Sequence, residues 1–264
     1  MEQHSVNKAI IRDFYRRVMG QGDMAFAEEI IADAYIQHSP MGKPGKAGLL
    51  EALAAFKQMP KPVVTSKPFM RLIAEGEYVV TNICFDWGGV QKVVVDLFRF
   101  QHGQVIEHWD VVQDQPEISR NGHSRNGNSR NGNAMMDGPV DADRDEPTEP
   151  NKTLIAAYYQ HIWIDRQVDQ LAAYVAVDLI QHDPDIANGI AGLRAYLHQE
   201  SMAIKTVHRI IGDGNFVVVQ ASGELTGKPT VFYDILRLSA GKITEQWRVH
   251  QAIPDKMEHT NGMI

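Results

Sequence analysis

The chain contains one segment twice, and this internal repeat limits what it can fold into more than any other feature. At an offset of 144, residues 7–56 match residues 151–200 at 14 of 50 positions. At an offset of 138, residues 71–113 match residues 209–251 at 14 of 43 positions. Agreement over such long stretches predicts two copies of one domain, each of the commonest domain size, rather than one large enzyme fold.

The segment between the two copies has the composition of a linker. Residues 116–150 contain no aromatic residue, carry three Ser-Arg-Asn-Gly pentads from Ser119 onward, and end in a stretch rich in Asp, Glu and Pro. Such a segment cannot bury enough apolar surface to offset its ordering entropy. We therefore expect a domain at 1–115, a flexible low-complexity linker at 116–150 and a second domain at 151–264. An anion-binding or modification site in the pentads stays open as an alternative.

Charge and cysteine content narrow the class of protein. The net charge is −7 and the pI is about 5.9, so no overall positive field attracts nucleic acid or an anionic membrane. The single cysteine, Cys84, cannot form an intrachain disulfide, and its apolar neighbours predict a buried side chain rather than a reactive thiol. Since we find no run of about 18 apolar residues and no secretion signal, we expect a cytoplasmic protein without a membrane or nucleic-acid partner.

In each copy, the sequence pattern predicts helices first and strands last. In the first copy, apolar residues recur at helical spacing from Val6 to Val18, and further helices are expected near 24–31 and 49–56. Four β-rich runs follow, separated by glycine-containing turns, at 72–73, 78–85, 90–100 and 105–113. This order predicts an α+β protein with two tandem cone-shaped domains, each with three helices packed in a curled antiparallel β-sheet. The open end of such a cone is a natural small-molecule pocket.

Strand alternation brings polar residues from two neighbouring strands to one face. His108 and Asp110 share a face of the last strand, and Asp96 lies among Phe98 and Phe100 on a face of the strand before it. If that face lines the pocket, two carboxylates and an imidazole converge in an apolar cavity. Burial there raises carboxylate pKa values. A carboxylate tuned in this way can remove a proton from carbon next to a carbonyl.

Two further sets of residues are assigned to the same pocket. His38 lies in the turn at 37–40, after the second expected helix, where we expect it to reach a substrate oxygen at the pocket mouth. We place substrate contacts at Phe98, Phe100, Tyr15 and Trp87.

Structural interpretations compete with these assignments. Asp96 could instead form an ion pair with Arg99 or Arg71, and His38 could cap a turn. The second copy keeps the same types of residue at Asp234, Arg237 and Arg209. Two histidines and two aspartates also suit a divalent metal ion, although we expect neither a metal nor another cofactor.

Three strings of the first copy carry a resemblance to a known family. DLFRF (96–100) and GQVIEHWDVVQ (103–113), with IQHSP (36–40) upstream, closely resemble the SnoaL-like polyketide cyclases of the nuclear transport factor 2-like superfamily of α+β cone folds. The resemblance implies a cofactor-independent intramolecular aldol condensation that closes a ring in an aromatic polyketide. It places the acid/base aspartate at Asp110 and a second substrate-facing position at Asp96.

The second copy departs from this pattern where the chemistry is expected. Its string EQWR at 245–248 places Arg248 where the first copy has Asp110, and a glutamine in place of the histidine. Arginine stays protonated and cannot act as a general base. We expect this copy to be catalytically silent, with His182, Asp183 and Asp234 retained as scaffold or as a pocket for an anionic ligand, and with Arg248 in the same pocket.

The tryptophans of the two strings predict how the copies associate. Trp109 and Trp247 fall on the strand faces that point away from the pockets. The resemblance implies that the sheets pair as an internal pseudo-dimer, and we expect both tryptophans at the contact. A further homodimer of the whole chain stays open.

These observations favour a small-molecule enzyme acting on a carbonyl-containing substrate. Asp110 is the expected acid/base, and His108, Asp96 and His38 orient the substrate carbonyl or tune Asp110. An isomerase or hydratase would use the same carboxylate. The alternative from a different class is a ligand-binding or protein-interaction module without chemistry, because the second copy has lost the motif.

Overall fold

The computed structural model describes residues 2–59, 71–116 and 132–264. Most of the pentads therefore lie outside the described residues. The first unit comprises α1 (Gln3–Asp13), the π-helical turn η1 (Phe14–Met19), α2 (Met24–Ile30), β1 (Ile31–Gln37), α3 (Gly45–Gln58), β2 (Arg71–Glu75), β3 (Tyr78–Trp87), β4 (Val90–Gln101) and β5 (Gln104–Asp114).

The second unit repeats this order. It comprises α4 (Thr148–Tyr158), the π-helical turn η2 (Tyr159–Ile164), the 3-10 turn η3 (Val168–Gln170), α5 (Leu171–Tyr174), β6 (Val175–Gln181), α6 (Gly189–Leu197), β7 (Met202–Asp213), β8 (Phe216–Leu225), β9 (Lys228–Ser239) and β10 (Lys242–Ala252). No helix among the described residues is long and apolar enough to cross a membrane.

Local sequence explains where the helices of the first unit begin and end. The apolar stripe expected from Val6 to Val18 buries Ile11, Phe14 and Val18 against the sheet. Gly22 then takes a positive φ of 73° that favours glycine. The Asp23 side chain accepts a hydrogen bond from the Phe26 amide and so caps α2.

Each sheet has five strands, one more than the sequence predicted. The order is β1-β5-β4-β3-β2 in the first unit and β6-β10-β9-β8-β7 in the second. The predicted antiparallel meander is present, but β1 and β6 add a strand that runs parallel to β5 and β10. β1 was not expected because its burial pattern does not alternate and its partner lies about 70 residues further along the chain. The prediction of an α+β fold in two tandem copies is confirmed.

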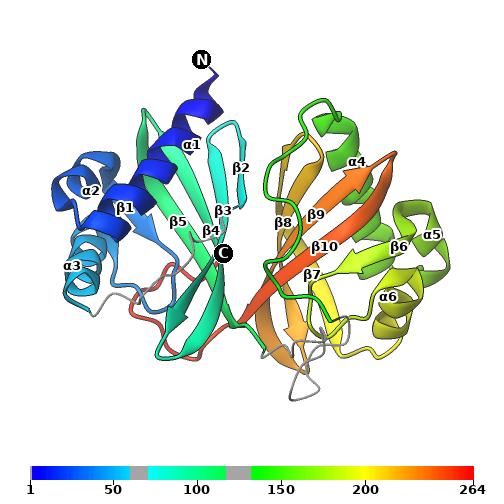
Figure 1. Ribbon diagram of the computed structural model, residues 1–264. Helices are drawn as coiled ribbons and strands as arrows, with labels where there is room; N and C mark the ends of the chain where they lie inside the picture. Colours follow the sequence, from blue (N-terminus) through cyan, green and yellow to red (C-terminus); the bar gives the residue numbers. More distant parts are fainter. Residues whose placement is uncertain (1, 60–70, 117–131) are drawn as a thin grey trace.

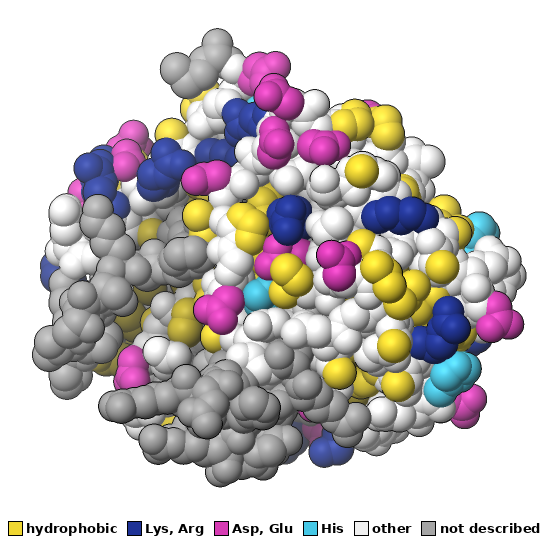
Figure 2. Space-filling view, turned by 45° about the vertical axis from the view of Figure 1, so that its right-hand side comes forward, with side chains coloured by type: hydrophobic (Ala, Val, Ile, Leu, Met, Phe, Trp, Pro, Cys, Tyr) yellow, Lys and Arg dark blue, Asp and Glu magenta, His cyan; other side chains and the backbone are white. Residues whose placement is uncertain are grey.

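The two units pack through their sheets, with the helices on the outside (Figure 1). One apolar core lies between helices and sheet in each unit, and a third joins the two sheets. Trp109 and Trp247, 0% and 1% exposed, both belong to this shared core. Their predicted place at the contact is confirmed. On the face drawn in Figure 2, acidic and basic side chains are interspersed, without one large patch of either sign.

The described part of the expected linker is packed rather than free. Met135 is only 2% exposed and belongs to the core between the sheets. Arg71 donates to the carbonyl oxygens of Asp137 and Pro139, at 2.5 and 2.8 Å. α4 also begins at Thr148, before the predicted boundary. Composition alone missed this packing because the two sheets supply the apolar surface that covers Met135.

Candidate active site

A cavity of about 210 Å³ lies between the helices and the sheet of the first unit. Its polar lining comes from Tyr15, Tyr35, Asp96, His108 and Asp110. The other lining residues are apolar: Ile11, Phe14, Met19, Ile31, Leu49, Leu53, Ile83, Phe85, Val94, Phe98, Val105 and Val112. The strand faces that were predicted to meet in a pocket therefore do so.

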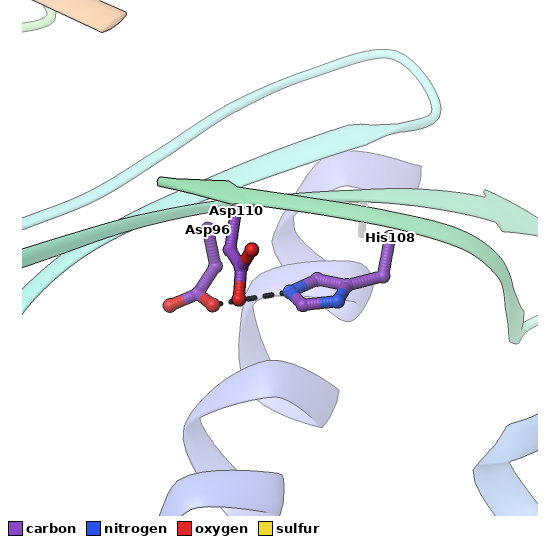
Figure 3. Close-up of side chains that lie close together, drawn as sticks. All are labelled: Asp96, His108 and Asp110. Carbon is purple, nitrogen blue, oxygen red and sulfur yellow. Dashed lines mark hydrogen bonds and ion pairs between the residues drawn. The ribbon is translucent and has the colours of Figure 1, made fainter. Parts of the chain in front are cut away.

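The register of β4 and β5 places two carboxyl groups opposite each other. Asp96 pairs directly with Asp110 across the antiparallel ladder. Figure 3 shows their side chains next to each other, with the imidazole of His108 pointing toward them. Like charges directly opposed on neighbouring strands repel, so a proton or a positive charge must offset them. His108 supplies that charge, since its Nε2 lies 3.0 Å from Asp96 Oδ1.

Asp96 is held firmly by the protein. The hydroxyl of Tyr15 donates to Oδ2 at 2.6 Å, and the hydroxyl of Thr81 donates to the same atom at 3.0 Å. These bonds occupy Oδ2 as an acceptor. Neither an Asp96–Arg99 nor an Asp96–Arg71 ion pair forms, because Arg99 binds Glu107 and Arg71 binds Asn82.

The protonation of His108 follows from its second neighbour. Its Nδ1 lies 3.1 Å from Gln37 Oε1, and the backbone N–H of Ser39 donates to the same oxygen. Because that N–H can only donate, the group facing His108 is the amide oxygen, and Nδ1 must carry a proton. Nε2 then meets Asp96 through one further proton shared by the pair.

The charges around His108 keep that proton bound. Burial lowers its pKa, but the hydrogen bond and charge of Asp96, with the charge of Asp110, outweigh burial. The pKa of His108 therefore lies above its usual value of 6.5. His108 therefore stays protonated to a higher pH than an ordinary histidine, beside the two aspartates.

Asp110 differs from Asp96 in having an oxygen without a protein partner. Its Oδ1 is buried and accepts no hydrogen bond from any described residue. Burial raises the pKa of Asp110 to about 6, and the charge of Asp96 acts in the same direction. His108 and Ser39 oppose this shift without cancelling it. Asp110 lines the cavity and can therefore accept or release a proton near neutral pH.

Tyr35 is a further polar group of the cavity, and the sequence interpretation missed it. Its hydroxyl is buried; Gln37 lies near it, but within the described chain no hydrogen bond of acceptable geometry reaches the hydroxyl. Burial and the charges of Asp110 and Asp96 raise its pKa well above 10.0, so it remains a hydrogen-bond donor. Recognising β1 as a strand beside β5 would have placed Tyr35 in the pocket.

Three predicted site residues do not line this cavity. His38 points to the other side of the sheet, where it stacks on Trp109 at 4.8 Å and its Nε2 contacts Glu107 at 2.8 Å. The parallel pairing of β1 with β5 causes this, because it sets Gln37, not His38, beside His108. Phe100 lies in the core near the end of β4. Trp87 is 46% exposed at the tip of a hairpin. Tyr15 and Phe98, in contrast, line the cavity.

The second unit has an ion-pair cluster at the equivalent place. Arg248 donates from Nε and Nη2 to the two oxygens of Asp234, each at 2.6 Å. Asp183 lies 3.7 Å from the same guanidinium, and the hydroxyl of Tyr159 also donates to Asp234. The guanidinium of Arg248 is fully buried and saturates Asp234. As the residue types predicted, this unit has an arginine and no general base at the position of Asp110.

The first-unit cluster also has the spacing of a cation site. Each of the three residues Asp96, His108 and Asp110 offers one ligand atom, and these atoms lie within 4.8 Å of one another. A divalent ion there would have to displace the proton shared by His108 and Asp96. Since both imidazole nitrogens of His108 already have partners, the geometry fits a protonated site better than a metal site.

Comparison with known proteins identifies the domain in both units. The family model described as "SnoaL-like domain" matches residues 11–108 and again residues 155–246. Similar solved structures include an NTF-2 like protein of unknown function from Burkholderia xenovorans LB400, with 18% identity over 44% of this chain and 89% of that chain, and a TM-score of 0.37.

Two other similar structures each cover less than half of this chain. One is TsrD from Streptomyces laurentii, with 16% identity over 43% of this chain and 91% of that chain, and a TM-score of 0.35. The other is a SnoaL-like polyketide cyclase from Agrobacterium tumefaciens, with 13% identity over 38% of this chain and 91% of that chain, and a TM-score of 0.33. A search of curated proteins gave no match. On the family match to both of its units, this chain belongs to the SnoaL-like domain family, with two copies in tandem.

Proposed function

We propose that the first unit is an enzyme that performs cofactor-independent acid/base chemistry on carbon next to a carbonyl group, with Asp110 as the base. The observation that carries this proposal is the place of Asp110, which lines an apolar cavity and has a buried Oδ1 without a hydrogen-bond partner in the described chain. A pKa of about 6 makes this carboxyl able both to take up and to return a proton. Membership in the SnoaL-like family supports the same class of reaction.

The reaction would begin with proton removal. Asp110 accepts a proton from the carbon next to the carbonyl, and the electrons of the broken C–H bond move to the carbonyl oxygen. We assign the Tyr35 hydroxyl as the donor that stabilises that oxygen, since Tyr35 lines the same cavity and its hydroxyl forms no well-aligned hydrogen bond within the described chain. In an aldol condensation, the enolate carbon then bonds to a second carbonyl carbon, and Asp110 returns its proton to the new alkoxide.

Asp96 and His108 would tune the base rather than touch the substrate. The charge of the protonated His108 imidazole lowers the pKa of Asp110 and limits the effect of burial, while the charge of Asp96 raises that pKa. Without the charge of His108, the pKa of Asp110 would lie higher. With it, both protonation states are available in the range where most enzymes work.

A second enzymatic reading uses the same groups. If Asp110 returned the proton to a different carbon of the enolate, the outcome would be an isomerisation instead of a ring closure. Product analysis separates the two reactions. Binding without chemistry is the remaining alternative, supported by the replacement of the base by Arg248 in the second unit.

Proton exchange tests the proposal without a known substrate. A panel of small cyclic ketones and 1,3-dicarbonyl compounds is incubated with the protein in D₂O, and deuterium uptake next to the carbonyl is followed by NMR. We expect at least one compound to exchange faster with the protein, and Asp110→Asn to lower the rate by about 10²-fold or more. Asp183→Asn, a buried carboxyl of the second unit with a pKa of about 6, is the matched control and should leave exchange unchanged. Exchange that survives Asp110→Asn would contradict the assignment.

A further inference from the structure

After β10, the chain leaves the second unit and returns to the first. Residues 258–264, which we call the tail, lie along the loop that follows β1, beneath the first unit in Figure 1. Asn261 Nδ2 donates to the carbonyl oxygen of Gln37 at 2.8 Å. His259 Nε2 donates to the carbonyl oxygen of Ser39, also at 2.8 Å.

The tail is packed and does not merely touch the surface. His38 Nδ1 donates to the carbonyl oxygen of Gly262 at 3.0 Å. Met263 is 2% exposed and belongs to the core between the two sheets. His259 is buried as well, and its Nδ1 accepts from the backbone N–H of Asn261. These contacts join a segment that follows the second unit to residues 37–39 of the first.

The residues that the tail holds are the ones that position His108. Asn261 binds the backbone of Gln37, and the side-chain oxygen of Gln37 accepts from His108 Nδ1 and from the Ser39 amide. His259 binds the backbone of Ser39. The tail thus fixes both ends of the short segment whose amide oxygen sets the protonation of His108.

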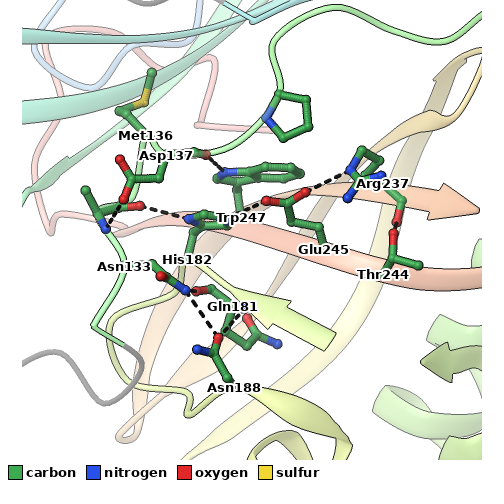
Figure 4. A network of polar contacts seen from close by, with 12 residues as sticks. Asn133, Met136, Asp137, Gln181, His182, Asn188, Arg237, Thr244, Glu245 and Trp247 are labelled. Carbon is green, nitrogen blue, oxygen red and sulfur yellow. Dashed lines mark hydrogen bonds and ion pairs between the residues drawn. The ribbon is translucent and has the colours of Figure 1, made fainter. Parts of the chain in front are cut away.

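An equivalent set of contacts joins the segment that follows the sheet of the first unit to the second unit. Asn133 Nδ2 donates to the carbonyl oxygen of Gln181 at 2.8 Å, and His182 Nδ1 donates to the carbonyl oxygen of Ala134 at 2.9 Å (Figure 4). Met135 is buried between the sheets like Met263. The sequences Asn-Ala-Met at 133–135 and Asn-Gly-Met at 261–263 therefore repeat. Each unit is closed by the segment that follows the sheet of the other.

The two sets of contacts differ in the side chain that the held glutamine binds. In the first unit, the side-chain oxygen of Gln37 accepts from His108. In the second, the side chain of Gln181 donates to Gln246, which replaces the histidine. The two segments therefore share a packing role, but only in the first unit does the glutamine that the segment holds bind a titratable side chain.

We propose that the tail is a positioning element of the acid/base site in the first unit, with Asn261 and His259 acting through Gln37 and Ser39 on His108. The assignment of a catalytic role rests on the function proposed above. This proposal also assigns a role to the second unit, because β10 of that unit anchors the tail that follows it. Loss of the tail contacts loosens the Gln37 amide, weakens the bond to His108 Nδ1 and lowers the pKa of His108.

Two asparagine variants of the full chain test this coupling. Asn261→Ala removes the bond to Gln37, and the matched variant Asn133→Ala removes the equivalent bond to Gln181 in the silent unit. The imidazole signals of ¹⁵N-labelled histidine, assigned with a His108→Gln reference, report the pKa and the tautomer of His108. We expect both variants to lower the denaturation midpoint by similar amounts. Only Asn261→Ala should lower the pKa of His108, by about 0.5, and increase the Nε2-protonated tautomer.

The remaining outcomes separate this proposal from the proposed function. His259→Ala should act in the same direction as Asn261→Ala, which guards against a local fault in one variant. If the His108 signals in Asn261→Ala and His259→Ala match those in Asn133→Ala, the tail is packing only and the inference is overturned, even where deuterium exchange depends on Asp110. If no compound exchanges, the proposed function fails while the His108 signals still show whether the tail controls that residue.

Discussion

Asp96 and Asp110 face each other across the β4–β5 pair, yet the protein holds them differently, because the hydroxyl groups of Tyr15 and Thr81 both donate to Oδ2 of Asp96. The buried Oδ1 of Asp110 has no such partner among the described residues. The two hydroxyl groups fix Asp96 in the scaffold. Burial raises the pKa of Asp110 to about 6, so this carboxyl group can take up or release a proton near neutral pH.

Asp110→Asn should make the protein more stable at high pH. The pKa of Asp110 is about 6 in the folded state and 3.8 when unperturbed, so the folded state binds the proton more tightly. The contribution of Asp110 to the free energy of unfolding is fully favourable below about pH 4, and it is lost as the pH rises through 6. We expect Asp110→Asn to raise the free energy of unfolding by about 1–3 kcal/mol at pH 8, with little difference at pH 4. Urea denaturation at both pH values measures this difference. Equal stability of the variant and the unchanged protein at pH 8 would show that burying the ionised Asp110 carboxylate does not destabilise the fold.

His108→Gln should shift the pH dependence of catalysis upward. The charge of His108 lowers the pKa of Asp110 and partly offsets burial. Removing that charge leaves burial and Asp96 opposed only by the smaller effects of Ser39 and His259, so the pKa of Asp110 rises above 6. Exchange activity, which needs the ionised carboxylate, should then require a higher pH for its half-maximal rate. Glutamine is the residue that the second unit carries at this position, so it suits the fold. An unchanged profile in a folded variant would assign the titration near pH 6 to another group.

Strand alternation predicted the meander and the face that carries Asp96, His108 and Asp110, because period-two patterning is local. It could not predict β1, whose pairing with β5 depends on a partner far along the chain. Tyr35 and Gln37 were therefore missed, and His38 was placed on the wrong side of the sheet.

In the second unit and the linker, too, local features could be predicted from the sequence, and contacts between distant segments could not. The residue type alone predicted that Arg248 could not serve as a base. The burial of Met135 depends on two sheets meeting, which composition does not record. The sequence therefore predicts what residues can do more readily than what distant segments cover.

Tyr35→Phe should reduce activity while leaving the fold at least as stable. The hydroxyl is buried and makes no well-aligned hydrogen bond within the described chain, so its removal relieves a desolvation cost of about 1 kcal/mol. If the hydroxyl stabilises the enolate oxygen, exchange should fall by about 10–10²-fold. Tyr158→Phe is the matched control, because Tyr158 has a buried hydroxyl in the second unit that is likewise without an acceptable partner in the described regions. Equal exchange rates in the two variants would remove Tyr35 from the mechanism.

Arg248→Met should destabilise the protein without affecting the site in the first unit. The guanidinium and the Asp234 carboxylate are both fully buried and bind through two hydrogen bonds of 2.6 Å. Removing the arginine leaves a buried carboxylate uncompensated, at a cost of about 3–5 kcal/mol. The double variant Arg248→Met/Asp234→Asn should recover most of this loss, because position 234 no longer carries a charge and the remaining buried carboxyl, Asp183, has a pKa of about 6 that rises further without Arg248 and so lets it take up a proton. Thermal denaturation of the three proteins gives the comparison. Since Arg248 does not line the first-unit cavity, deuterium exchange measured on the folded fraction should be unchanged. A loss of exchange in the folded double variant would show that the second unit takes part in the chemistry.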